Sequence, residues 1–321
     1  FGRIGNGSGF VGGMVVSGSL AGKTVVELAA GYNFYLARTS DNQLYAWGYN
    51  NYGNFGNGTT NNSSTPVAVT MTGALAGKTV VGIACGLESS YALTSDGLVF
   101  AWGGNTYGQI GDNTTTTRTL PVAVNTAGVL NGKTVAAISS SGYHCVVRTT
   151  DGQLFAWGLN DCGQLGNNTK NQANVPVAVN MTGALAGKTI LAAYAARQYS
   201  GSAGSHTVAL ASDGKLYAWG INGFGQLGNG TTNASLVPTE VDMTGALAGK
   251  TISKLFSYDT GNMVITSDNQ VYAWGYNVYG QLGNGTTTTP LTPVAVDLSP
   301  LGTKTIAEVT GGGGFYLFRT T

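Results

Sequence analysis

Charged side chains are scarce in this sequence. Lysine, arginine, aspartate and glutamate together make up only 9% of the 321 residues, and the formal net charge is +1. Nucleic acids and anionic membrane surfaces attract proteins through clustered positive charge, which this composition does not supply. We therefore expect no nucleic-acid binding and no electrostatic attachment to a membrane.

Residues that carry acid–base, nucleophilic or metal chemistry are also few. There are two histidines, no clustered carboxylates, and three cysteines (Cys85, Cys145 and Cys162) whose spacing fits neither a CxxC pair nor a metal site. We expect no catalytic residues, no metal site and no cofactor. The cysteines are interpreted as small apolar core residues, with a Cys85–Cys145 bridge between neighbouring repeats as the alternative.

Long apolar runs are missing as well. No segment approaches the roughly 18 residues that cross a bilayer, so we expect no membrane insertion. The chain opens with "FGRIGNGSGF", which has neither an initiator methionine nor a signal-peptide pattern. We expect a processed, recombinant or partial chain.

One stretch superficially resembles a phosphate-binding loop: "MTGALAGKTV", residues 71–80. Only three residues separate Gly73 from Gly77, whereas such a loop has four, and the segment after Thr79 reads as a strand where the motif needs a helix. Related stretches occur six times in the chain. We therefore interpret the motif as a repeated connector and not as a nucleotide site.

The connector and the tryptophans define a repeat. The tryptophans are separated by 55, 55, 62 and 55 residues, and a lysine marks each of six units: Lys23, Lys78, Lys133, Lys188, Lys250 and Lys304. The first unit holds four strand-like runs, at 24–30, 34–39, 43–48 and 66–70, separated by turn residues. Four short strands at a constant period predict an all-β fold, a six-bladed β-propeller of four-stranded antiparallel blades. We expect residues 1–321 to form a single propeller domain.

Proline marks the fourth strand of each unit. Pro66 and its equivalents lie at the start of "PVAV"-type runs, and proline is tolerated at strand starts and edges because it has no N–H to donate. The fourth strand is therefore predicted at the edge of its blade.

The combined repeat resembles the regulator of chromosome condensation (RCC1-like) family. The resemblance rests on "AWGYNNYGNFGNGTT" (46–60), four similar segments at 101–115, 156–169, 218–232 and 273–287, the "PVAV" strands, and the "SDG" turns. It covers essentially the whole chain and implies a propeller, although typical members have seven blades. It also implies function through protein contacts made by loops. The uniform, weakly charged Thr/Asn-rich repeats look most like the bacterial secreted type, similar to beta-lactamase inhibitor protein II.

Two groups of loops are expected at opposite ends of the blades. The connector lysines should lie beside the repeat aspartates, Lys78 beside Asp96 for example, and form a solvated charged rim. The AWGxNxxG loops should leave from the other end, with Asn50 and its equivalents bonded to their own loop backbone. The tryptophans are interpreted as packing residues between blades.

The candidate binding residues lie on the second group of loops. Aromatic side chains recur at one loop position, as Tyr52, Tyr107, Phe224 and Tyr279. At the same end, the fourth unit carries a seven-residue excess within 194–206, which contains Arg197, Gln198 and Tyr199, residue types frequent at interfaces. Drift in a tolerant Gly/Ser loop is the alternative interpretation of this excess.

The two ends of the chain together make an incomplete sixth blade. Phe1 aligns with Tyr52, and the terminal "GFYLFRTT" (314–321) aligns with 33–40, so that both termini close the blade while its third strand is missing. We predict a strand-acceptor slot formed by Phe1, Gly2, Phe315, Leu317 and Arg319. Residues outside the given sequence, a three-stranded blade, or a strand donated by another molecule are the alternatives for filling it.

These patterns predict a non-enzymatic propeller, extracellular or on a bacterial cell surface, that acts as a protein-interaction scaffold. Its partners would be other proteins or copies of itself. The alternatives are a structural subunit of an extracellular polymer completed by strand donation, and a lectin that binds glycans at several loops.

Overall fold

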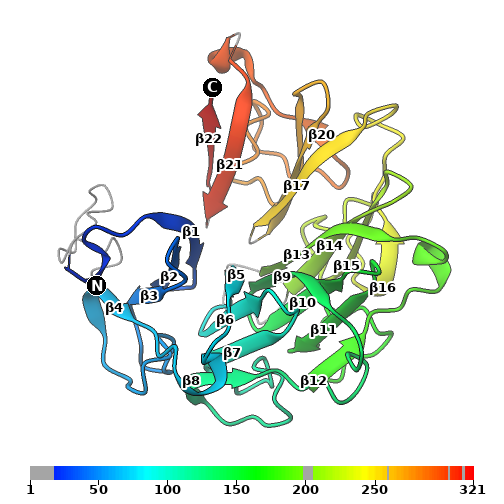
Figure 1. Ribbon diagram of the computed structural model, residues 1–321. Helices are drawn as coiled ribbons and strands as arrows, with labels where there is room; N and C mark the ends of the chain where they lie inside the picture. The colour runs from blue at the N-terminus through cyan, green and yellow to red at the C-terminus, as the bar shows by residue number, and fades with distance from the viewer. Residues whose placement is uncertain (1–17, 198–204, 259, 303, 313–314) are drawn as a thin grey trace. The chain divides into compact units, whose positions relative to one another are not determined.

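A computed structural model describes residues 18–197, 205–258, 260–302, 304–312 and 315–321. Short β-strands dominate these residues, and the helical elements among them are single 3-10 turns (Figure 1): η1 (Gly18–Leu20), η2 (Gly73–Leu75), η3 (Gly183–Leu185) and η4 (Ser299–Leu301). None of the helices in these ranges is long and apolar enough to cross a membrane.

The strands form five four-stranded antiparallel sheets and a two-stranded one, numbered here as sheets 1 to 6 in chain order. Sheet 1 contains β1 (Val25–Ala30), β2 (Phe34–Thr39), β3 (Leu44–Gly48) and β4 (Ser63–Ala68). Sheet 2 contains β5 (Val80–Cys85), β6 (Ser89–Thr94), β7 (Val99–Gly103) and β8 (Arg118–Ala123). Sheet 3 contains β9 (Val135–Ser141), β10 (His144–Thr149), β11 (Leu154–Gly158) and β12 (Ala173–Ala178).

The remaining sheets follow the same up-and-down order. Sheet 4 contains β13 (Ile190–Arg197), β14 (Ser205–Ala211), β15 (Leu216–Gly220) and β16 (Ser235–Glu240). Sheet 5 contains β17 (Ile252–Tyr258), β18 (Gly261–Thr266), β19 (Val271–Gly275) and the short β20 (Val294–Ala295). Sheet 6 contains β21 (Ile306–Gly312) and β22 (Phe315–Thr320).

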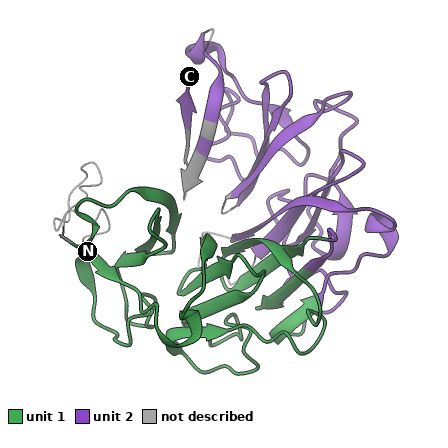
Figure 2. Ribbon diagram, in the orientation of Figure 1, with its two compact units in different colours: residues 1–150, 155–159, 171–177 green, residues 151–154, 160–170, 178–321 purple. Residues whose placement is uncertain are grey.

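The chain divides into two compact units (Figure 2). Unit 1 comprises residues 1–150, 155–159 and 171–177, and unit 2 comprises residues 151–154, 160–170 and 178–321. Sheets 1 and 2 and most of sheet 3 belong to unit 1, whereas sheets 4 to 6 belong to unit 2. The single propeller domain stays a prediction.

The core lies between successive sheets. In unit 1, Leu36 and Phe34 of sheet 1 pack with Phe100 and Trp102 of sheet 2. In unit 2, Val264 and its neighbours of sheet 5 pack against sheet 4 in the same way. Every residue of β3, β7, β11, β15 and β19 is buried, because these third strands have a neighbouring strand on both edges and packed side chains on both faces. This explains their continuous apolar sequence, of the type LYAWG.

The repeated GKT segment is confirmed as a connector. The 3-10 turn η2 follows β4 and buries Leu75, and Lys78 then leads into β5. A strand therefore follows the motif where a phosphate-binding loop would open a helix.

The fourth strand begins earlier than the sequence pattern predicts. The predicted run was 66–70, but β4 spans Ser63–Ala68, so Pro66 lies inside the strand and not at its start. A register shift between Ala46 and Gly48 of β3 accommodates the proline, which has no N–H for the ladder. The edge position of β4 in its sheet is confirmed.

Candidate functional site

The long loops that join the third strand of each four-stranded sheet to the fourth are all built around one buried asparagine. The five loops span residues 49–62, 104–117, 159–172, 221–234 and 276–293. Their asparagines are fully buried: Asn50, Asn105, Asn160, Asn222 and Asn277. Such burial is stable only because each amide finds partners inside its own loop.

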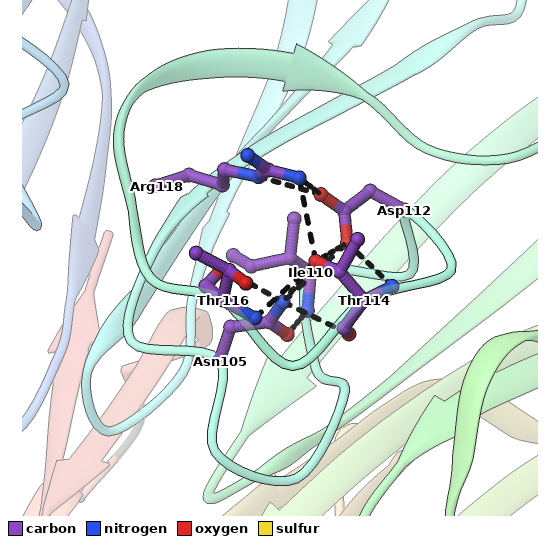
Figure 3. Close-up of polar contacts among 6 residues, drawn as sticks. All are labelled: Asn105, Ile110, Asp112, Thr114, Thr116 and Arg118. Atoms are coloured by element: carbon purple, nitrogen blue, oxygen red, sulfur yellow. Dashed lines mark hydrogen bonds and ion pairs between the residues drawn. The ribbon is translucent and has the colours of Figure 1, made fainter.

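The second loop shows the geometry (Figure 3). Asn105 Oδ1 accepts the backbone N–H of Ile110 at 2.9 Å, and Asn105 Nδ2 donates to the carbonyls of Thr114 at 3.1 Å and Thr116 at 3.0 Å. In the other four loops the equivalent oxygen also accepts the N–H five residues on, at 2.8–2.9 Å. The predicted local role of these asparagines is confirmed.

An ion pair reinforces this loop alone. Arg118 Nε lies 2.6 Å from Asp112 Oδ2, and Asp112 Oδ1 accepts the hydroxyl of Thr114 at 2.7 Å (Figure 3). Burial opposes ionisation of Asp112, but the Thr114 hydroxyl and the Arg118 guanidinium outweigh it and lower the pKa of Asp112. Asparagine stands at this position in the other long loops.

Each long loop also anchors the next sheet. The carbonyl of Asn54 accepts the indole N–H of Trp102 and the hydroxyl of Ser90, both at 2.8 Å. Equivalent indole bonds run from Trp157 to the Gln109 carbonyl, from Trp219 to that of Gln164 and from Trp274 to that of Gln226, at 2.8–3.0 Å. The tryptophans are therefore packing and hydrogen-bonding residues between sheets, as the sequence predicts, and are buried.

The aromatic loop residues predicted to bind a partner stand at the surface to different degrees. Tyr279 is 80% exposed and Tyr52 is 37% exposed, whereas Tyr107 and Phe224 are half-buried. Tyr107 packs on Tyr143 with ring centroids 4.9 Å apart. In unit 2, Phe224 lies 4.7 Å from Tyr276, which in turn lies 6.1 Å from Tyr279. The predicted residues thus belong to small aromatic clusters.

The candidate in the fourth unit falls largely outside the described residues. Gln198 and Tyr199 lie there, and Arg197 is the last residue of β13, of whose side chain nothing is described. Backbone pairing of Arg197 with Ser205 and of His206 with Gly220 places this hairpin at the sheet end from which the long loop leaves. That predicted location is confirmed.

The predicted strand-acceptor slot is also only partly described. Phe1 and Gly2 lie outside the described residues, and Phe315, Leu317 and Arg319 lie on β22. Within the described ranges β22 pairs with β21 alone. A Cβ at Gly228 would meet the next sheet's tryptophan ring at 2.7 Å, but at the equivalent Gly283 only Val296 lies within reach, at 3.4 Å. The fifth loop therefore lacks, among these residues, the tryptophan contact that the other four have.

The charged rim at the opposite end of the sheets is confirmed. Lys78 Nζ lies 2.6 Å from Asp96, Lys250 lies 2.6 Å from Asp268, and Lys23 pairs with Asp41. In unit 2, Lys188 lies 3.4 Å from Asp213. Such partly exposed pairs compensate one another and contribute little each.

The histidines and two of the cysteines are core residues. His144 and His206 are fully buried, and His206 Nε2 lies 3.0 Å from Asn262 Oδ1. Burial lowers the pKa of His206 to about 4. Cys85 and Cys145 are buried free thiols, as the core interpretation predicts, and Cys162 is a half-buried one. No group of three or more metal-ligating side chains occurs within the described ranges.

Sequence reasoning missed Glu88, Tyr143 and Gly104, which lie together at the long-loop end of unit 1. Tyr143 Oη donates to Glu88 Oε1 at 3.5 Å, and the Gly104 N–H donates to the Glu88 carbonyl at 2.7 Å. The signal that could have found them is departure from the repeat. The position of Glu88 holds Asn33, Tyr143, Ser205 and Thr260 in the other units.

Repeated four-stranded antiparallel sheets, each fastened to the next by a tryptophan, define the class of the protein as an RCC1-like β-propeller. The chain belongs to the RCC1-like domain family, whose model matches residues 11–318. The five complete sheets and the two-stranded one are consistent with six blades. The closure of the sixth blade by both termini lies outside the described residues.

Known proteins similar to this chain include a plant photoreceptor and two solved propellers. The ultraviolet-B receptor UVR8 of Arabidopsis thaliana is 30% identical over 279 residues, which cover 87% of this chain but only 59% of the receptor. Human WBSCR16 aligns with a TM-score of 0.78 at 22% identity, over 95% of this chain and 74% of that one. Prp20p of Saccharomyces cerevisiae, described with its binding to Gsp1p and histones, aligns with a TM-score of 0.75 at 21% identity, over 94% and 70%. The two structures show the fold alone.

Proposed function

We propose that this chain is a non-enzymatic protein-binding module that contacts its partners through the long loops. One observation carries the proposal: five loops share the same buried asparagine frame but present different aromatic groups at their surface. A rigid frame lowers the conformational entropy that binding would otherwise cost. Tyrosine provides large contact area with few rotatable bonds, which suits it to an interface.

The family membership supports the same proposal. RCC1-like relatives act in protein interactions, and Prp20p binds Gsp1p and histones. The chain spans only part of its curated relatives, so their activities are not carried over. What is carried over is the mode, in which loops on a propeller make the contacts.

Photo-crosslinking tests the proposal. A benzophenone amino acid replaces Tyr107 in one variant and Tyr279 in a second, and Lys78 of the opposite rim in the matched control. Each captured protein is then purified and its affinity measured against Tyr107→Ala, Tyr279→Ala and Lys78→Ala. We expect capture from the loop positions and an affinity loss of roughly tenfold in a loop variant, because an aromatic anchor contributes about 1 to 2 kcal/mol. Equal capture from the rim, or equal affinity in all variants, would contradict the proposal.

The extracellular or bacterial cell-surface location is part of the proposal. It is supported by the 9% content of charged residues and by the nearly identical Thr/Asn-rich repeats. Fractionation of the source cells, with the chain detected in the medium or surface fraction, is the expected result. Retention inside the cell would reject this location.

A second candidate is a subunit that receives a strand from another copy or another protein. The observation that favours it is the fifth loop, whose Gly283 has no tryptophan partner among the described residues, together with the single pairing of β22. A synthetic peptide of residues 41–51, the third strand of the first unit, provides the probe. Saturable binding of this peptide and a sedimentation mass above the monomer are expected. A monomer that ignores the peptide would reject strand donation.

Glycans are the remaining candidate ligand, because exposed tyrosines such as Tyr279 also stack on sugars. A glycan array distinguishes this case. Binding that falls in Tyr279→Ala would favour a lectin, and a blank array would leave the protein-binding proposal in place.

A further inference from the structure

Glu88 is a half-buried carboxylate without a cationic partner. It lies in the turn between β5 and β6, and no lysine, arginine or histidine pairs with it among the described residues. Other carboxylates of the chain are paired, Glu27 with Arg38 and Glu240 with Lys215 for example. A partly desolvated charge that lacks a partner destabilises the protein, so its presence requires an explanation.

The fold leaves space for this carboxylate at Gly104. The residue that follows the AWG tripeptide is Tyr49, Leu159, Ile221 or Tyr276 in the other loops, but glycine here. The backbone does not require it, because Gly104 is absent from the positive-φ glycines. A Cβ at Gly104 would instead lie 3.0 Å from Glu88 Cβ and 3.1 Å from Glu88 Oε2. The glycine therefore accommodates the side chain of Glu88.

Three tyrosines surround the carboxylate. Tyr143 donates its hydroxyl to Glu88, and its ring packs on Tyr107. The charge of Glu88 raises the pKa of Tyr52, whose ring lies 6.2 Å from that of Tyr49. Burial, and then the Glu88 charge, raise the pKa of Tyr143 to about 12. The tyrosine hydroxyls thus stay neutral, and their rings remain electron-rich surfaces beside a negative group.

Backbone hydrogen bonds hold this cluster rigidly. The Tyr32 N–H donates to the Leu87 carbonyl at 3.2 Å, and the Leu87 N–H donates to the Gly142 carbonyl at 2.8 Å. Glu88 and Tyr143 are the next residues along the second and third of these turns. Sheets 1, 2 and 3 therefore each contribute to one preorganised site, and every contributing residue belongs to unit 1.

We propose that Glu88, Tyr52, Tyr107 and Tyr143 form a receptor for a cationic side chain, the guanidinium of arginine or the ammonium of lysine, carried by a protein partner. A carboxylate supplies the ion pair and the tyrosine faces supply cation–π attraction, a combination that binds such groups in water. The proposal rests on the proposed function only in naming a protein as the source of the cation.

Nuclear magnetic resonance of the full chain with ¹³C-labelled tyrosine rings tests the site. The probes are N-acetyl-arginine amide and N-acetyl-lysine amide, and N-acetyl-citrulline amide is the neutral control. We expect saturable shifts at Tyr52, Tyr107 and Tyr143 with the cationic probes. Tyr276 and Tyr279, which form an aromatic cluster around Thr260 instead of a glutamate position, serve as internal controls and should not move.

Three variants separate the causes. Glu88→Gln keeps the shape and removes the charge, and it should weaken the probe about tenfold, the loss of one partly buried ion pair. Gly104→Leu introduces the residue of the third loop and should abolish binding by filling the space. Asp161→Asn makes the same change in net charge at an exposed carboxylate and should leave affinity unchanged. Equal shifts with citrulline, or unchanged affinity in Glu88→Gln, would overturn the proposal.

The two proposals fail separately. If a cross-linked protein partner binds Glu88→Gln as tightly as the parent, the cation receptor is wrong and the protein-binding function stands. If the probes bind as described but no protein is captured at the long loops, the receptor stands and its assignment to a protein partner is wrong.

Discussion

Replacing Asn105 by alanine removes the side chain around which the second long loop is built. Three hydrogen bonds are lost, from the Ile110 N–H at 2.9 Å and to the carbonyls of Thr114 and Thr116 at 3.1 and 3.0 Å. Because Asn105 and Ile110 are both fully buried, water does not replace these bonds without opening the loop. At about 1 to 1.5 kcal/mol for each bond, the free energy of unfolding should fall by roughly 3 to 5 kcal/mol.

Two measurements check this prediction. Urea denaturation followed by tryptophan fluorescence gives the global change, and amide hydrogen exchange gives the local one. Exchange should accelerate strongly at Ile110 and remain unchanged at Leu165, whose N–H donates to Asn160 at 2.9 Å in an unaltered loop. This internal comparison separates loop opening from global destabilisation.

Asn54→Ala is the matched control. Asn54 is an equally buried asparagine, but its side-chain amide has no hydrogen-bond partner in the described part of the chain. Its replacement should therefore cost less than about 1 kcal/mol. If Asn105→Ala costs no more than Asn54→Ala, or if Ile110 exchange does not change, the asparagine frame does not hold the loop.

Three further predictions follow from the same contacts. Asn54→Gln should stabilise the protein by about 1 kcal/mol and slow amide exchange at Tyr52, because glutamine in the other four loops accepts the N–H two residues earlier at 2.8–3.1 Å; unchanged exchange would contradict it. Burial lowers the pKa of His206 to about 4, so the unfolded chain binds its proton first, and roughly 3 kcal/mol of stability should be lost as pH falls from about 6.5 to about 4. Urea midpoints of the parent and of His206→Phe across this range check it, and equal acid sensitivity would refute it. Lys250→Ala should raise the pKa of Asp268 from about 2 towards its usual value, because the Lys250 hydrogen bond is the largest cause of its lowering; a ¹³C carboxyl titration that shows no rise would reject that cause.

The repeating features of the fold could be predicted from the sequence because each is written several times. A third strand such as LYAWG, a lysine such as Lys78 and an asparagine such as Asn50 each recur at the same spacing, so one physical role explains every copy. The salt bridge of Lys78 with Asp96 and the loop bonds of Asn50 confirm those roles. The boundary of β4 could not be predicted, because the register shift that places Pro66 inside the strand depends on its pairing with β3.

The cluster around Glu88 could not be predicted for the opposite reason. Glu88, Tyr143 and Gly104 are departures from the repeat, and each taken alone is an ordinary surface substitution. Their proximity depends on turn-to-turn hydrogen bonds, such as that of Leu87 with Gly142, which join sheets 55 residues apart in sequence. Comparing equivalent positions between units identifies the candidates, but only the structure brings them together.

A uniform repeat also separates the residues that stabilise the fold from those free to bind. The turn that begins each second strand needs only its carbonyl, which accepts the N–H after the AWG tripeptide whether the residue is Asn33, Glu88 or Tyr143. The side chain at that position is therefore unconstrained by the frame. Burial raises the pKa of Glu88, so its ionised form destabilises the folded state as pH rises through that pKa. A charge that costs stability, in a space made by a glycine that the backbone does not need, is the arrangement expected of a binding residue whose partner supplies the missing cation.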